Sequence, residues 1–331
     1  MRASVSMPEG WGNTRAAADA RRALSQLRTL ILPVCRWLAR HVDLLAALSV
    51  VIVSAVLHAV NLFSFPYYQT YRLSVLPNRR GHLRRQAWAI LRRGELAHDT
   101  YWYDHAPFGW IQVAAWTVVS QGFYTFGTPI DSGRVLMVVL HCWSTYLVFQ
   151  ITRTVSRSVL TAALASLLFG VSAYGIYYHR RVLLDNITTP WMLLSILMIV
   201  RAPLALSRVW ISAVALGVSI LSKELTVFLV PVLGAFVCMR AARSQRLFAT
   251  LTWLFIVSAL VSTYPLMALL KSEMFPAGTP LGGQEEHVSL IESLRYQAAR
   301  GRDAGLLSSR DADNPPRDSS DRRSVVRSVG A

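Results

Sequence analysis

Charged residues are scarce in this sequence. Only 16% of its 331 residues are charged, 53% are hydrophobic and the mean hydropathy is +0.37, whereas soluble domains carry about 25% charged residues. An ordinary soluble domain is therefore excluded. Several apolar runs reach the roughly 20 residues that a membrane span needs, which predicts an all-α, polytopic membrane protein. The formal net charge of +16 does not indicate a nucleic-acid partner, because most arginines stand at the ends of apolar runs or in the tails.

Cysteine and lysine are also rare. The three cysteines Cys35, Cys142 and Cys238 lie far apart in or beside apolar segments, which excludes a disulfide framework and a cysteine-based zinc motif. Lys223 and Lys271 are the only lysines among 34 basic residues, a bias towards arginine that is typical of a GC-rich genome. The N-terminal segment lacks the short apolar core and small-residue cleavage site of a signal peptide.

The apolar runs predict about seven transmembrane helices. A basic segment, 1–42, precedes a bundle, 43–270, which includes a polar and aromatic loop at 64–132; residues 271–331 form a tail, disordered from about 308. The last short runs, 209–221 and 225–239, are alternatively one helical hairpin broken at "SKE". The expected spans are Asp43–Phe63, Val135–Ile151, Ser158–Tyr178, Val182–Val200, Val209–Leu221, Leu225–Met239 and Phe248–Leu270.

The distribution of arginine predicts the orientation. Arginines precede the first span and recur in alternate short loops, so the N-terminus is expected to be cytoplasmic. The loop 64–132 and the tail then face outward. Within that loop, "QAWAILRRGEL" and "APFGWIQVAAWTVVSQGF" predict helices lying in the membrane interface; the second is alternatively a further span.

Four short motifs share the predicted outer face. They are "YWYDHAPFGW" at 101–110, "YYHRRVLLDNITTP" at 177–190, "ILSKEL" at 220–225 and "ALLKSEMFP" at 268–276. Their order and sidedness, over about residues 43–300, resemble the GT-C membrane glycosyltransferases, in the branch of the protein O-mannosyltransferases and lipid A aminoarabinose transferases. The resemblance implies transfer of a sugar from a polyprenyl-phosphate carrier to a lipid, glycan or protein acceptor outside the cytoplasmic membrane.

The resemblance also suggests which residues act. Asp104 and Asp185 are the candidate catalytic residues, and a divalent metal is a candidate cofactor without assigned ligands. An ionisable group inside an apolar run, such as Asp185, is usually functional. Arginine suits bidentate phosphate contact and lysine acts as a point charge. Alternatively, Asp104 and His105 only make loop hydrogen bonds and anchor the loop in the interface. Arg180 and Asp185 then form an ion pair that only holds two helices together, and Lys223 and Glu224 form an ion pair within their helix or with a neighbour. The candidates for substrate or phosphate binding are His105, Arg180, Lys223 and Glu224.

One expected feature is missing. The family places an Asp-Glu pair soon after the first span, but no acidic residue occurs between Asp43 and Glu95. Instead, "LSVLPNRRGHLRRQAW" follows at 73–88. One allowed choice of codons for residues 73–85, when it is read one base later, encodes Phe-Pro-Tyr-Tyr-Gln-Thr-Asp-Glu-Gly-Thr-Tyr-Val-Ala. This shifted translation repeats residues 65–70 and then supplies the missing Asp-Glu pair. We interpret 71–85 as frame-shifted text; the alternative is a natural basic loop that binds anionic lipids.

These features define the functional expectations. The chain is predicted to be an inactive fragment of a glycosyltransferase, since the acid pair and the family's later spans are missing. A small-molecule transporter and a non-catalytic membrane protein are the alternatives. His58 and His141, on apolar segments, are predicted to be buried core residues with satisfied ring nitrogens.

Overall fold

The described part of the chain is entirely helical where its structure is regular, which confirms the all-α prediction. Asp104, the segment 71–85 and the region predicted to be disordered from about 308 lie outside the described residues. The computed structural model describes residues 41–63, 87, 89–94, 96, 103, 105–126, 129–280, 282 and 288–299.

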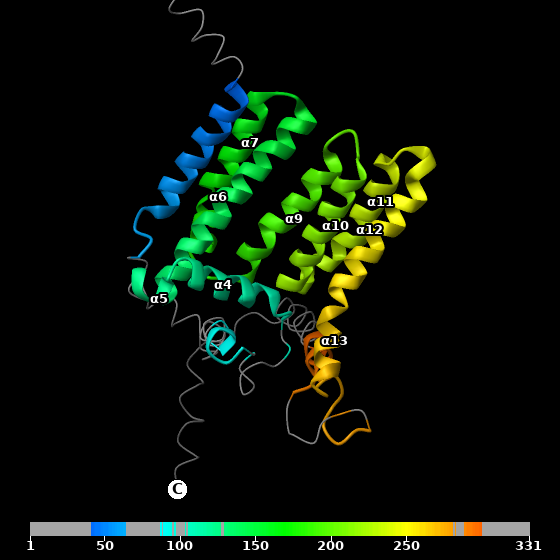
Figure 1. Ribbon diagram of the computed structural model, residues 1–331. Helices are drawn as coiled ribbons and strands as arrows, with labels where there is room; N and C mark the ends of the chain where they lie inside the picture. The colour runs from blue at the N-terminus through cyan, green and yellow to red at the C-terminus, as the bar shows by residue number, and fades with distance from the viewer. Residues whose placement is uncertain are drawn as a thin grey trace, which may run out of the picture.

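The helices stand mostly side by side, with α4 across one end of the bundle (Figure 1). The first helix, His41–Ala59, is blue in that view. Helix α9 packs against α6 and α10, α10 against α12, and α6 against α7. The labelled elements are α4 (Phe108–Val119), α5 (Gly122–Thr125), α6 (Pro129–Ser156), α7 (Val159–Val171), α8 (Ala173–His179), α9 (Leu184–Val200), α10 (Leu206–Ser222), η2 (Glu224–Phe228), α11 (Leu229–Arg240), η3 (Arg243–Gln245), α12 (Arg246–Val261) and α13 (Thr263–Leu270).

Three helical segments among the described residues are long and apolar enough to cross a membrane: His41–Ala59, Asp131–Ser156 and Arg243–Leu270. A fourth is added if α7 and α8, bent by 56°, count as one span. The expected number of about seven is thus met only in part. Helices α9 and α10 have 17 residues each and α11 has 12, and the extended backbone of Lys223 ends α10. The predicted break at "SKE" is confirmed.

Apolar side chains cover the outside of the bundle, while small hydroxyl residues lie inside. Leu168 and Phe255 are 72% and 73% exposed. The buried Ser212 Oγ instead lies 3.0 Å from Ser195 Oγ and accepts a hydrogen bond of 3.1 Å from Trp253 Nε1. Small hydroxyl residues between close-packed helices are typical of bundles that pack within a lipid bilayer.

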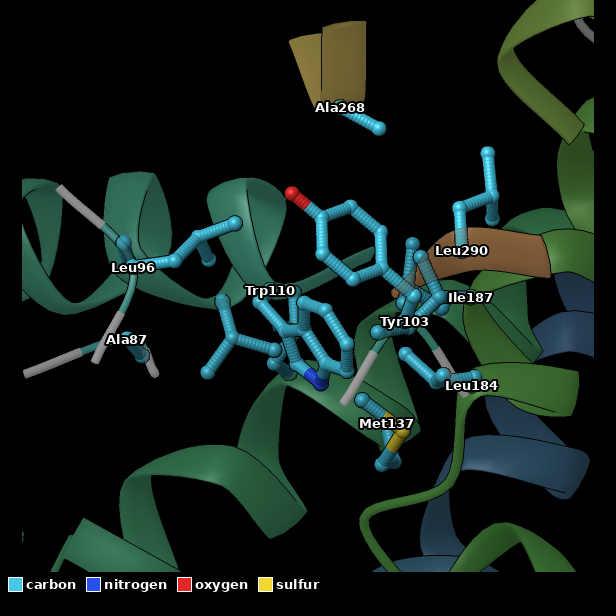
Figure 2. Packing of buried hydrophobic residues seen from close by; sticks show 13 residues of the cluster. Ala87, Leu96, Tyr103, Trp110, Met137, Leu184, Ile187, Ala268 and Leu290 are labelled. Atoms are coloured by element: carbon cyan, nitrogen blue, oxygen red, sulfur yellow. The ribbon is translucent and has the colours of Figure 1, made fainter. Parts of the chain in front are cut away.

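A compact apolar cluster anchors the segment before α4. Figure 2 shows the rings of Tyr103 and Trp110 among side chains from α6, α9, α13 and the helical residues 290–299. The backbone carbonyl of Tyr103 accepts hydrogen bonds of 3.0 Å from Tyr264 Oη and from Ser293 Oγ. These contacts stabilise Tyr103 at a φ of 52°, a left-handed conformation that is unfavourable for a bulky residue. Part of the predicted tail therefore folds back onto the bundle.

The side chain of Tyr103 makes a further link to this returning segment. Its hydroxyl donates a hydrogen bond to Glu273 Oε2. Burial raises the pKa of Tyr103 well above its usual range, and the hydrogen bond to Glu273 acts in the same direction. The phenol therefore stays protonated and remains a donor at neutral pH.

Helix α4 is too short to be the additional span considered above. Its 12 residues extend about 18 Å, against a hydrocarbon core of about 30 Å. A Cβ at Gly109 would lie 2.4 Å from Leu184 Cδ2 and 3.2 Å from the Ser222 carbonyl oxygen. Glycine therefore lets α4 pack directly on the ends of α9 and α10.

Candidate functional site

Two of the predicted site residues form an ion pair at the end of the bundle that α4 covers. Asp185 lies in the first turn of α9 and Lys223 follows the last residue of α10. Because the two helices pack antiparallel, these positions meet, and Lys223 Nζ contacts Asp185 Oδ1. The helix dipole also favours a carboxylate in a first turn. The side chains are 24% and 56% exposed for Lys223 and Asp185, so anions in solution can reach the pair.

A second pair joins the segment before α4 to the start of η2. His105 Nδ1 lies 3.1 Å and 3.2 Å from the two carboxylate oxygens of Glu224. The backbone N–H of Ala106 donates a hydrogen bond of 3.2 Å to Glu224 Oε1. Glu224 thus fixes both the His105 ring and the backbone that leads into α4. Since Glu224 directly follows Lys223, the two pairs belong to one polar cluster.

Gln112 joins three helices at this end, a role that was not predicted from the sequence. Gln112 Oε1 accepts a hydrogen bond of 2.7 Å from Trp191 Nε1, and Gln112 Nε2 donates one of 2.9 Å to Ser222 Oγ. Its side chain therefore links α4 to both α9 and α10. The sequence feature that could have indicated this role is a glutamine within the largely apolar segment of α4, because a polar group on a packed face requires hydrogen-bond partners.

Arg180 makes different contacts from those expected. Its Nη2 donates hydrogen bonds of 2.8 Å to the carbonyl oxygens of Leu57 and Val60. Carbonyls at the end of a helix lack intrahelical partners, so Arg180 stabilises the end of the first helix. The alternative pairing of Arg180 with Asp185 is wrong in this structure, because the carboxylate contacts Lys223. Phosphate binding by Arg180 stays a prediction.

The opposite end of the bundle is basic. Arg153 Nε contacts Asp43 Oδ1 at 3.1 Å, Arg201 Nη2 donates to Gln150 Oε1 at 3.1 Å, and Arg240 Nη2 donates to the Val200 carbonyl at 2.7 Å. Asp185 lies in the first turn of α9 and Arg201 follows its last residue, so the two are about 24 Å apart along the helix axis. The distribution of charge therefore distinguishes the two ends.

A candidate metal centre does not coincide with the Asp185–Lys223 pair. Among the described residues, the group of three potential ligands consists of His58, His141 and His179. His58 and His141 are buried, as predicted, but the prediction that their nitrogens are satisfied is wrong. Within the described part of the chain, Nε2 of His58 and both ring nitrogens of His141 have no hydrogen-bond partner. Position on an apolar helix revealed their burial but not their neighbours.

Comparisons of the chain with protein-family models, with curated proteins and with solved structures found no match.

The geometry of the polar cluster permits two chemical events. An anion that binds the Lys223 ammonium would compete with Asp185 and release its carboxylate. A released carboxylate can accept a proton from a hydroxyl group that lies within hydrogen-bond reach. His105, held by Glu224, places an imidazole ring in the same polar cluster.

Proposed function

We propose that this chain is a multi-pass membrane protein related to glycosyltransferases that use polyprenyl-phosphate sugars. Its polar cluster would bind the carrier phosphate on the outer side of the cytoplasmic membrane, where a lipid, glycan or protein acceptor receives the sugar. In this arrangement α9 and α10, with their flanking residues, and the continuous segment formed by η2 and α11 are further spans. The main supporting observation is the accessible Asp185–Lys223 pair beside the His105–Glu224 pair, built from segments distant in sequence.

The proposed role of Lys223 is to bind phosphate. An ammonium group makes charge-assisted hydrogen bonds with phosphate oxygens, and the carrier phosphate would displace the Asp185 carboxylate. Asp185 would then be free to accept the proton of the acceptor hydroxyl as its oxygen bonds to the anomeric carbon. The bond between that carbon and the carrier phosphate breaks in the same step, and the phosphate leaves bound to Lys223. Phosphate binding and activation of the acceptor are thereby coupled through a single ion pair.

Transfer by the chain as written is expected to be very low. The Asp-Glu pair that the family resemblance implies, which would supply a further general base or a metal ligand beside Asp185, is missing, and a basic segment does not remove a proton at neutral pH. Loss of a general base typically lowers the rate by about 10²- to 10⁴-fold. The proposed function therefore separates into carrier binding, which this chain retains, and transfer, which requires the acidic pair.

Carrier binding is measured with polyprenyl phosphate and the full chain in nanodiscs. Lys223→Met should weaken binding roughly 10-fold or more, because a hydrogen bond to a charged group is lost. Asp185→Asn should strengthen it, because the carboxylate no longer competes for Lys223. Lys271→Met is the matched control, since Lys271 is the only other lysine, and should leave the affinity unchanged. Equal affinities for the wild type and Lys223→Met would overturn the proposal.

Transfer is measured in membranes supplied with polyprenyl-phosphate sugars. Replacement of residues 71–85 by Asp-Glu-Gly-Thr-Tyr-Val-Ala should raise the rate by about 10²-fold or more. In that repaired chain, Asp185→Asn should lower transfer while carrier binding persists. Equal rates for the repaired and unrepaired chains would show that the acid pair is not the catalytic centre. The nucleotide sequence across codons 70–86 tests the frame-shift interpretation separately.

A further inference from the structure

Three histidines from three helices meet inside the bundle. His58 comes from the first helix, His141 from α6 and His179 from the last position of α8. One ring nitrogen of each lies within 4.8 Å of one from each of the others. The ring centroids of His58 and His141 are 3.9 Å apart, and those of His141 and His179 are 4.2 Å apart. Apolar core packing alone does not require three imidazoles at one point.

The cluster contains unused hydrogen-bonding capacity. His58 and His141 are 0% exposed. Among the described residues, no partner is present for Nε2 of His58, Nε2 of His179 or either ring nitrogen of His141. Buried polar atoms are nearly always satisfied by protein or another bound group. Four unsatisfied nitrogens in one place therefore indicate a ligand that accepts nitrogen lone pairs.

The outer hydrogen bonds set the tautomer that a metal requires. His58 Nδ1 lies 2.8 Å from the Ser54 carbonyl oxygen, and His179 Nδ1 lies 2.9 Å from the Gly175 carbonyl oxygen. A carbonyl only accepts, so each Nδ1 carries the proton and each Nε2 presents a lone pair. Backbone carbonyls commonly orient metal-binding histidines in this way.

We propose that His58, His141 and His179 bind a transition-metal ion of the class that prefers imidazole, with Zn²⁺ as its representative. Three neutral nitrogen donors without a carboxylate suit zinc, copper or nickel and do not suit Mg²⁺ or Ca²⁺, which prefer oxygen. Three protein ligands leave a fourth tetrahedral position for water or an anion. This site is distinct from the Asp185–Lys223 pair and does not depend on the proposed glycosyltransferase function.

Binding requires a small rearrangement of the rings. Tetrahedral zinc with bonds of about 2.0–2.1 Å places its nitrogen ligands about 3.4 Å apart, closer than the 4.8 Å limit that the three atoms satisfy. The rings, which are tilted against one another, must therefore turn so that their lone pairs converge. His179 is less buried than the other two, so an ion can enter from its side.

Positive charge beside the cluster selects the fourth ligand. Arg180 follows His179 and binds the carbonyl of Leu57, the neighbour of His58. A permanent guanidinium charge opposes a bare divalent ion and favours an anion, such as hydroxide or chloride, in the open position. The bound ion would join the end of the first helix to α6 and α8.

The test uses the full chain, purified through a tag without histidine, stripped with a chelator and titrated with Zn²⁺. The wild type should bind about one equivalent, and Zn²⁺ should raise its Tm because it binds the folded state. Co²⁺ in place of Zn²⁺ should give the intense visible absorption of a tetrahedral nitrogen site, while Mg²⁺ should produce neither effect.

His58→Gln, His141→Gln and His179→Gln should each lower the Zn²⁺ affinity at least 10-fold and remove the rise in Tm. His41→Gln, outside the cluster, is the matched control and should bind as the wild type does. Circular dichroism and the metal-free Tm identify any variant that fails to fold; the conclusion then rests on the folded variants. No stoichiometric Zn²⁺ binding by the wild type, or equal affinity in all folded variants, would overturn the proposal.

Discussion

The two ends of the helix bundle carry different chemistry. At the end that α4 crosses (Figure 1), two pairs of polar side chains form, Asp185 with Lys223 and His105 with Glu224. At the other end, arginines bind mainly main-chain carbonyl and amide oxygens, as Arg240 binds the Val200 carbonyl. The first end thus contains groups that a ligand can compete for, whereas the second uses charge to stabilise helix ends and loops.

This difference has a physical origin in both topology and hydrogen bonding. Arginines gather in short loops on the side of a membrane where positive charge is retained, and their guanidinium groups also satisfy carbonyls left free at helix C-termini. The Asp185–Lys223 pair is partly exposed, and such pairs contribute only about 0–1 kcal/mol to stability. A contribution to stability therefore accounts for the arginines of the basic end better than it accounts for the Asp185–Lys223 pair at the end that α4 crosses.

The largest expected effect concerns the sidedness of the two ends. With the native cysteines replaced, Ser207→Cys marks the basic end and Ser272→Cys marks the segment after α13. A membrane-impermeant maleimide applied to intact cells should label Cys at 272 and should label Cys at 207 only after permeabilisation, because the basic end is expected to be cytoplasmic. Labelling of both positions in intact cells, or the reverse pattern, would contradict the proposed orientation.

A smaller effect is expected from crowding α4 against the end of the bundle that it crosses. Gly109→Ala should lower the free energy of unfolding by about 1–3 kcal/mol, because the added methyl overpacks the contact with Leu184 and Ser222. Gly175→Ala is the control, since its Cβ would meet Ser172 Cβ at an ordinary 3.4 Å. Thermal unfolding in detergent, followed by circular dichroism, measures both. Equal Tm values would show that α4 is not closely packed there.

The smallest effect compares one glutamine at each end. Gln112→Leu removes two hydrogen bonds, to Trp191 and Ser222, and should lower the free energy of unfolding by about 1–2 kcal/mol. Gln150→Leu removes the acceptor of Arg201 at the basic end and should lower it by less than about 1 kcal/mol, because water can replace the lost partner. A larger loss at Gln150 in the same unfolding measurement would reverse this ranking.

The sequence predicted the helical class and several of its boundaries. Apolar runs located the helices, because a continuous apolar segment must bury its surface against other helices or lipid. The break at Lys223 was predicted because three consecutive polar residues interrupt such a run. The number of helices able to span a membrane was predicted less well, because α9 and α10 fall just short of the required length. The backbone conformation at the ends of a helix decides how many residues it contains, and the apolar run alone does not reveal that conformation.

Which side chains pair with one another was decided by the tertiary structure alone. The sequence suggested that Asp185 and Lys223 share one face, but it did not show whether Asp185 would pair with Arg180 or with Lys223. That choice depends on how α9 and α10 rotate about their axes when they pack, and Arg180 instead binds the end of the first helix. Gln112 likewise acquired its role only through the packing of α4 on two helix ends.

The histidine cluster shows most clearly which features followed from the sequence and which from the tertiary structure. Composition determined that His58 and His141 lie on apolar helices and would therefore be buried. Only the packing of the first helix against α6 and α8 brought them to His179 and left their ring nitrogens facing one another. The physical reason is that burial follows from the apolarity of a segment, whereas a site requires side chains distant in sequence to converge in space.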